Sequence, residues 1–176
     1  KMAQAIYDGL YSYYVDLSDP TDRVSAVFGN DQENLIINAP SGVFNHPMTS
    51  VWNASGINPG FIPIFPDMVE DSYATIGLSG PASTSGIAGA ADPSLVEDSA
   101  QPVSSFFLVD GHPGIVNNTL TGSSWYTLNT ATNGLSDADG RVLIMQVTTT
   151  GSISGMINYQ VFPLGIGSDQ VQISLD

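Results

Sequence analysis

The sequence predicts an all-β protein: a single antiparallel β-sandwich or jelly-roll-like domain of about nine strands with two long loops. Three observations support this fold class. Apolar and polar residues alternate in short segments, which is the pattern of half-buried strands. Glycine (18 residues) and proline (11 residues) provide frequent turns. The length of 176 residues suits one domain, because chains of this size bury roughly 70% of their unfolded surface.

The alternating segments predict the strands in chain order. The first strand is expected at residues 4–17, and one of its faces carries large apolar side chains: Tyr7, Tyr11, Tyr13, Val15 and Leu17. Further strands are expected at residues 23–28, 34–38, 72–78, 103–110, 124–128, 141–149, 152–162 and 170–175. Segments 39–71 and 79–102 lack the alternation and are expected to be the two long loops. The first of them carries large apolar residues, so we expect it to pack over an edge or end of the sandwich.

Residues 141–162 are expected to form a β-hairpin of two central strands, because apolar residues occur on both faces of each strand. Asp137 and Asp139 lie just before it. An EF-hand alignment on Gly140 fails, since Leu135 and Gln146 fall at positions that require carboxylates. The two aspartates are therefore predicted to form a turn into the strand, with a calcium site as the alternative.

The charge balance excludes several classes of partner. Seventeen acidic residues face only Lys1, Arg23 and Arg141, which gives a net charge of -14. Nucleic acids and anionic membrane surfaces are therefore poor partners. No apolar run approaches the roughly 18 residues of a membrane span, so none is expected. Cysteine is absent, which excludes disulfides, thiolate metal sites and a cysteine nucleophile.

The sequence offers little that predicts catalysis. His46 and His112 each precede a proline, which favours a loop or turn. The chain contains no "GxSxG", "HExxH" or "GxxxxGK[ST]" motif. We therefore expect no enzyme activity and no cofactor. The carboxylates of a second loop cluster are the other candidate ligands for Ca²⁺, namely Asp67, Glu70 and Asp71.

Several residues are candidates for glycosylation. Asn53 and Asn117 each begin an N-x-[ST] triplet in a segment expected to be a loop. Thr148, Thr149 and Thr150 are candidates for O-linked glycans. An acidic, cysteine-free chain with two such triplets is expected to be an extracellular or cell-surface glycoprotein.

Two segments carry a resemblance. "DSYATIGL" (71–78) and "DADGRVLIMQVTTTGSISGMINYQVF" (137–162) resemble a largely uncharacterised β-sandwich domain of secreted and surface proteins of aquatic microbes. Most of the chain is similar to protomers of glycosylated extracellular fibrils from freshwater. The resemblance implies a structural subunit of a filament or surface layer. Its partners are then covalent glycans and other copies of the chain, joined into a homopolymer by a terminal strand in a neighbour's groove.

Under this hypothesis residues 1–18 form the donor strand and residues 19–176 form the sandwich domain. Two alternatives stay open. The first is that residues 4–17 pair within their own sandwich. The second is a carbohydrate-binding or adhesion module, calcium-dependent in one version, with aromatic stacking platforms at Trp52, Trp125 and Tyr126.

Overall fold

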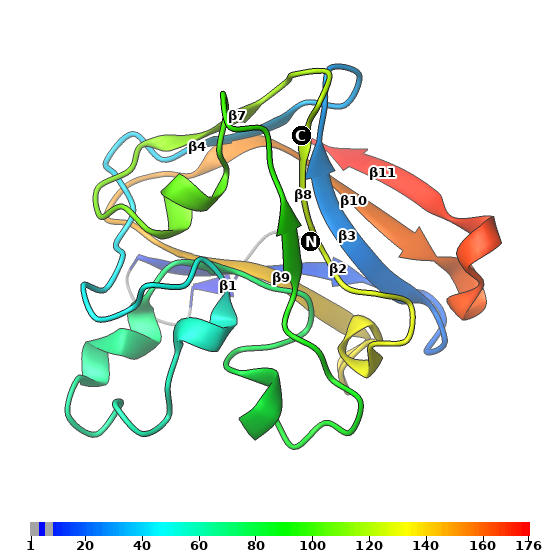
Figure 1. The fold of residues 1–176 in the computed structure, drawn as a ribbon, viewed down its shortest axis with the longest axis horizontal. Coiled ribbons are helices and arrows are strands. Elements are labelled where there is room, and N and C mark those ends of the chain that lie inside the picture. Colours follow the sequence, from blue (N-terminus) through cyan, green and yellow to red (C-terminus); the bar gives the residue numbers. More distant parts are fainter. Residues whose placement is uncertain (1–3, 6–8) are drawn as a thin grey trace.

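Two antiparallel sheets pack face to face in the computed structural model, which describes residues 4–5 and 9–176 (Figure 1). Sheet A has the spatial order β1 (Gln4–Ala5), β2 (Leu10–Asp16), β9 (Arg141–Thr148), β5 (Tyr73–Ala74). Sheet B has the order β6 (Ser94–Val96), β8 (Ser123–Tyr126), β3 (Arg23–Gly29), β10 (Ser154–Phe162), β4 (Leu35–Asn38), β7 (Gly114–Asn117), with β11 (Val171–Leu175) also paired to β10. The all-β sandwich class predicted from the sequence is confirmed.

Helical structure in the described residues is limited to short 3₁₀ turns in the connections. These turns are η1 (Ala54–Gly56), η2 (Pro66–Glu70), η3 (Ala82–Thr84), η4 (Ser104–Phe107), η5 (Thr132–Gly134), η6 (Pro163–Gly165) and η7 (Gly167–Asp169). The scarcity of longer helices agrees with a sequence whose apolar residues recur with period two rather than 3.6.

The strand β10 is paired along its length by successive short strands. β4 pairs with residues 154–156, and β3 pairs with residues 158–162. β7 and β8 in turn pair with β4 and β3. The chain is interrupted between β3 and β4, and again between β7 and β8 beside them. Gly29 lies at this break, where an added Cβ would be 2.5 Å from the Leu35 Cβ. Only glycine fits this close approach without displacing its neighbour.

Buried amide side chains satisfy the backbone at these interruptions. The Asn158 side chain is fully buried, and its Nδ2 donates to the carbonyl oxygens of Phe28, Glu33 and Asn34. The Glu33 carbonyl also accepts from the Asn30 N–H at 2.9 Å. Loss of a hydrogen bond that satisfies a buried polar group costs about 1–3 kcal/mol. The amide therefore allows the sheet to remain continuous where the strand is broken.

The main core lies between the sheets and draws on both of them. Trp125 of β8 is fully buried there, and its indole Nε1 donates to the carbonyl of Ile144 in β9 at 3.2 Å. Val142 and Ile144 face this core. Leu143, between them, packs instead into a second cluster that includes Ile57 and Met68. The second cluster therefore lies on the outer face of sheet A.

The second cluster explains the first long loop. Figure 1 shows the irregular segment (cyan to green) beside sheet A rather than extended away from it. The buried members of the second cluster are Ala54, Ile57, Met68, Tyr73 and Leu78, and the first three of them belong to this segment. The expectation of a packed, irregular excursion for residues 39–71 is therefore confirmed, and the excursion covers a sheet face.

Three predictions about elements were wrong. Residues 103–110 do not form a strand: η4 occupies Ser104–Phe107, and the rings of Phe106 and Phe107 are both buried. Short strands occur where none was predicted, at β6 and β7. Residues 141–162 do not form a hairpin, because β9 belongs to sheet A and β10 to sheet B. Both strands are central in their sheets, as expected, but residues 149–153 cross between the layers.

Candidate functional site

The N-terminal strand β2 lies along β9 within the same chain. The pairing is antiparallel and runs from Leu10 opposite Thr148 to Asp16 opposite Arg141. On the other edge of β2, β1 pairs only with residues 11–12. Among the strands that the structure describes, none pairs with the outer edge of residues 13–16. β2 is therefore an integral strand of sheet A and is partly exposed at its edge.

The side chains of β2 anchor the strand in the main core. Val15 is 3% exposed, and Tyr13 and Leu17 pack against the same cluster. Burial, together with the nearby Tyr11, raises the pKa of the Tyr13 hydroxyl to about 12. Three of the five predicted side chains thus contribute to one apolar face. Tyr11 is partly buried, and Tyr7 lies outside the described residues.

A β-bulge between Tyr13 and Tyr14 changes the other face of β2. The Arg141 guanidinium lies over the Tyr14 ring, 4.2 Å from its centroid. A cation above an aromatic face contributes about 0.5–1 kcal/mol at exposed sites. This contact further holds the C-terminal end of β2 against β9.

Residues 17–22 connect β2 to β3 through a compact turn. Asp19 Oδ1 accepts a hydrogen bond from the Thr21 N–H at 2.8 Å, and the Asp22 N–H donates to the Asp19 carbonyl at 3.1 Å. Hydrogen bonds from Thr21 hold the pKa of the exposed Asp19 carboxyl below its usual value. Pro20 restricts the backbone between them. This turn takes the chain from sheet A to sheet B.

The turn predicted at Asp137 and Asp139 is confirmed. Asp137 Oδ1 accepts hydrogen bonds from the backbone N–H groups of Asp139 (2.9 Å) and Arg141 (3.1 Å). Gly140 adopts φ +78°, and its N–H donates to the Asp137 carbonyl at 3.0 Å. Both aspartates also form ion pairs with the Arg141 guanidinium. Both Asp137 carboxylate oxygens and Asp139 Oδ2 therefore already have partners in a turn at the entrance to β9.

The second carboxylate cluster contains a buried histidine. His46 is 4% exposed and lies between the rings of Phe44 and Phe65. Its Nδ1 accepts from the Met48 N–H at 3.2 Å, so the neutral ring carries its proton on Nε2, which is 3.4 Å from Asp67 Oδ1. The ring nitrogen that could accept a proton from a nucleophile is therefore Nδ1, and the Met48 N–H occupies it.

Asp71 anchors the same loop to sheet A. The side chain is 1% exposed, and its Oδ1 accepts from the His46 N–H at 2.6 Å. Gln146 of β9 donates from Nε2 to the Asp71 carbonyl at 2.8 Å and to the Val69 carbonyl at 2.9 Å. The role of Gln146 was missed, because a polar residue inside an alternating segment reads as solvent-facing. Glu70 is only partly buried. Across the described residues, no group of three or more acidic or histidine side chains is arranged to hold a metal ion.

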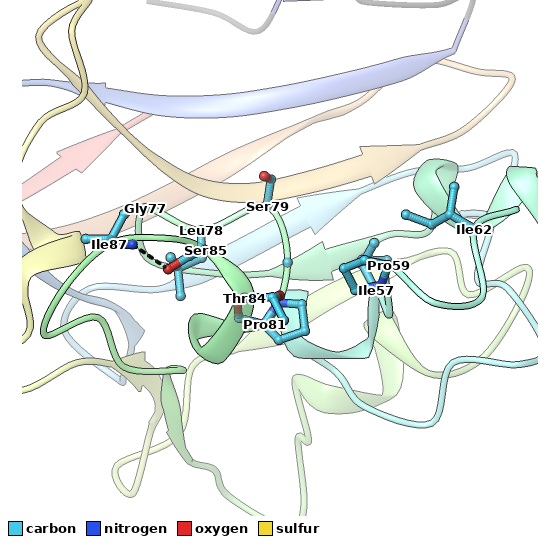
Figure 2. Close-up of a pocket in the computed structure, with 11 residues that line it drawn as sticks. Ile57, Pro59, Ile62, Gly77, Leu78, Ser79, Pro81, Thr84, Ser85 and Ile87 are labelled. Carbon is cyan, nitrogen blue, oxygen red and sulfur yellow. Dashed lines mark hydrogen bonds between the residues drawn. The ribbon is translucent and has the colours of Figure 1, made fainter.

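A shallow pocket opens between the two long loops. Figure 2 shows its lining, which comes from residues 57–62 and 77–87 and includes Ile57, Leu78, Pro81 and Ile87. Its volume is about 320 Å³, and none of its lining residues is titratable. The pocket therefore provides no carboxylate or imidazole, and its lining combines apolar side chains with the hydroxyls of Ser79, Thr84 and Ser85 (Figure 2).

The predicted sugar platforms are mostly core residues. Trp125 is fully buried and is excluded as a stacking platform. Trp52 is partly buried and packs against the main core. Tyr126 alone of the three is not part of that core, and its ring is also partly buried. Sugar stacking requires an exposed aromatic face, so only the partly buried Trp52 and Tyr126 remain candidates for it.

Both predicted N-glycosylation sites have buried amides. Asn117 is fully buried, and its Nδ2 donates to the Gln101 carbonyl and to Ser123 Oγ. Asn53 is 6% exposed, and its Nδ2 donates to the Pro93 carbonyl at 3.2 Å. The folded chain leaves no room for a glycan on either nitrogen. This burial argues against the attachment expected from the sequence, in which a triplet with a buried asparagine looks the same as one with an exposed asparagine.

The three consecutive threonines at the end of β9, Thr148, Thr149 and Thr150, differ from one another in exposure. Thr149 is 4% exposed, and its hydroxyl donates to the Gly42 carbonyl at 2.6 Å. The Thr148 hydroxyl is buried as well. Thr150 is exposed. Only Thr150, among the predicted attachment residues, can carry a glycan without disturbing the described fold.

Comparisons with known proteins returned no relatives. No protein-family model matches the chain, and no curated protein or solved structure is significantly similar to it. The part of the chain that the structure describes contains no helix long and apolar enough to cross a membrane.

Proposed function

We propose that the chain is a structural subunit of an extracellular filament or surface layer, and that its N-terminal strand links protomers. In the linked form, β2 of one protomer lies beside β9 of the next. The observation that carries this proposal is the position of β2. It lies between the short β1 and β9, with β1 covering its outer edge only at residues 11–12. Its apolar side chains pack into the main core, and one short turn joins it to β3.

Exchange of β2 between copies requires few new contacts. The strand would make the same hydrogen bonds and the same core contacts with a neighbour as it makes with its own chain, so only residues 17–22 change conformation. Each protomer donates one strand and accepts one. Such a contact is heterologous, and it continues into a filament when the rotation between protomers does not close a ring.

The distribution of charge also favours β2 as the segment that links protomers. At a net charge of -14, copies of the chain repel one another over most of their surface. Residues 9–15 carry no charged side chain. Main-chain hydrogen bonds and alternating pockets are the usual basis of strand addition, and both are available along β9.

The proposal includes extracellular location and covalent glycans, as the resemblance implies. The burial of Asn53 and Asn117 removes them as attachment residues, so we assign a glycan to the exposed Thr150. Thr150 begins the connection that leads away from the end of β9 nearest Leu10. A glycan at Thr150 therefore lies near the Leu10 end of β2, whereas the connecting turn lies at the Asp16 end.

Cysteine cross-linking tests the exchange, because the chain has no cysteine of its own. Asp16 and Arg141 are cross-strand partners, so Asp16→Cys and Arg141→Cys are introduced into separate chains carrying different tags. The chains are refolded together at high concentration and oxidised. We expect a disulfide between the two tagged chains and filaments in negative-stain micrographs of the wild-type protein.

A matched control pairs Arg141→Cys with Asp31→Cys, since Asp31 is exposed and is not a partner of β9. This control should not cross-link above background. A third chain carries both Asp16→Cys and Arg141→Cys. If a disulfide forms only within this third chain, and no filaments appear at any concentration, β2 is a purely intramolecular strand and the proposal fails.

A further inference from the structure

The strand β11 presents an unprotected sheet edge. It pairs with β10 from Val161 opposite Val171 to Ile157 opposite Leu175. No strand among the described residues pairs with its other edge, and Figure 1 shows β11 (red) on the outside of sheet B beside β10. Residues 171–175, "VQISL", contain no charge, proline or glycine. Natural edge strands are normally blocked by one of these devices, so this edge is open to a further strand.

The core-facing side of β11 extends beyond the core. Val171, Ile173 and Leu175 are opposite residues 161, 159 and 157 of β10, which face the main core. Ile173 packs against that core, whereas Val171 is 44% exposed and Leu175 is 47% exposed. A row of three apolar side chains therefore stands at the margin of the sandwich and is only partly covered.

We infer that β11 is an interface for β11 of a second copy of this chain, paired antiparallel about a twofold axis at Ile173. In this register Val171 is opposite Leu175 of the second copy, Ile173 is opposite Ile173, and Gln172 is opposite Ser174. Every apolar residue meets an apolar residue, and every polar residue meets a polar one. The strand is therefore complementary to itself, which identifies the occupant as a second copy.

Neighbouring registers are less favourable. The apolar side chains of the two copies must lie on the same face of the joined sheet. Only registers that move the centre of pairing by a whole residue meet this condition, because a slip of one strand by one residue turns each side chain to the other face. Centring the axis on Gln172 places Leu175 opposite Asp169, and centring it on Ser174 places Gln172 opposite Asp176. The Ile173-centred register alone pairs all five residues of β11 without an acidic partner.

This contact goes beyond the exchange of β2. It is isologous and closes as a dimer, whereas the β2 contact is heterologous. It also joins two copies of sheet B into one continuous sheet, without moving any element of the described fold. An assembly that uses both contacts pairs two filaments side by side.

Charge substitutions at the exposed pair test the interface. A chain whose β2 is locked in place by an Asp16→Cys/Arg141→Cys disulfide cannot extend a filament, and it is expected to sediment as a dimer of the 18.5 kDa chain. In Val171→Lys/Leu175→Lys, lysine faces lysine across the axis, and we expect the dissociation constant to rise at least about tenfold, because like charges directly opposite are destabilising. In Val171→Lys/Leu175→Glu, lysine faces glutamate and the dimer should return. The control Val116→Lys/Leu120→Lys alters two exposed apolar residues elsewhere, 52% and 84% exposed, and should remain dimeric.

The register is tested by single cysteines. Ile173→Cys should form a disulfide-linked dimer on oxidation, and Gln172→Cys should not, because only residue 173 meets itself. The lysine and glutamate variants are compared in this locked chain by sedimentation, and the single-cysteine variants are oxidised without the lock. A dimer of the locked chain separates this interface from strand exchange. A locked chain that stays monomeric at millimolar concentration, or a locked double-lysine variant that dimerises as tightly as the locked parent, overturns the inference.

Discussion

The Asp71 carboxylate accepts a hydrogen bond from the backbone N–H of His46 at 2.6 Å, in a setting where Asp71 is only 1% exposed. Burial raises the pKa of the Asp71 carboxyl to about 6, against the lowering effect of the His46 N–H. Its second oxygen has no hydrogen-bond partner in the structure. The Asp71 carboxylate therefore holds residues 44–49 in place, while burial makes its negative charge unfavourable.

We expect the stability to fall as the pH rises through the range in which Asp71 ionises. The folded pKa of about 6 lies above the ordinary value of 3.8, so the folded chain holds this proton more tightly than the unfolded chain. The stabilisation is complete below pH 3.8 and is lost as the pH approaches 6. Its size is about 2–3 kcal/mol, on the basis that one pKa unit corresponds to roughly 1.4 kcal/mol.

Urea unfolding at several pH values between 4 and 7 measures this effect, with Asp71→Asn as the comparison. The amide keeps an acceptor for the His46 N–H but does not ionise. The free energy of unfolding of the wild type should decrease relative to that of Asp71→Asn across this range. Two parallel pH profiles would show that Asp71 does not titrate in this way.

Asn158→Leu should lower the free energy of unfolding by about 2–4 kcal/mol. Leucine is similar in volume, but it removes the donor shared by three backbone carbonyls at the break between β3 and β4. Chemical denaturation measures the change. Asn118→Leu is the matched control, because Asn118 is exposed, and it should cost less than about 1 kcal/mol. Equal effects at both positions would contradict the role of Asn158.

Asp137→Ala should destabilise the chain by about 1 kcal/mol, and Asp137→Asn by less. The Oδ1 atom accepts two backbone N–H bonds in the turn, and an asparagine oxygen can replace it. Thermal unfolding distinguishes the two variants. If the carboxylates served as calcium ligands instead, added Ca²⁺ would raise the melting temperature of the wild type more than Mg²⁺ does, and Asp137→Asn would abolish the difference.

Asn117 should carry no N-linked glycan when the chain is secreted from a eukaryotic cell and folds. Its amide nitrogen is fully buried and donates two hydrogen bonds. Glycopeptide mass spectrometry measures the occupancy, and a Thr119→Ala variant identifies any signal that depends on the triplet. A soluble, cooperatively folded protein with Asn117 largely occupied would mean that this part of the fold is different.

Period-two alternation predicted the long strands well, because each has one face toward a core. It located β3, β4, β8, β9, β10 and β11 within a few residues. It failed at residues 103–110, where adjacent phenylalanines are both buried in a 3₁₀ turn. A short apolar run does not distinguish a buried strand from a buried turn. It also failed to assign β9 and β10 to different sheets, since a five-residue connection suits a hairpin and a crossing equally.

The candidate sites were less predictable than the fold, because burial decides them. Trp125 and Asn117 carry the right functional groups for sugar stacking and glycan attachment, yet both lie fully inside. The turn at Asp137 was predictable, since it depends on local spacing and on a glycine with positive φ. Gln146 and Asn158 act on backbone groups far along the chain, and local sequence holds no record of such partners.

The pairing of β2 with β9 also affects the order of events during synthesis. Leu10 cannot pair within its own chain until Thr148, which lies 138 positions later, has been synthesised. At 5–20 residues per second, translation takes roughly 7–28 s to cover that interval. During this interval β2 has no β9 of its own chain to pair with, while completed chains made from the same messenger RNA already contain β9. Ribosome-bound chains stalled before residue 141 should therefore be cut readily within residues 10–16 by a protease, and the cleavage should slow when a chain lacking residues 1–17 is added.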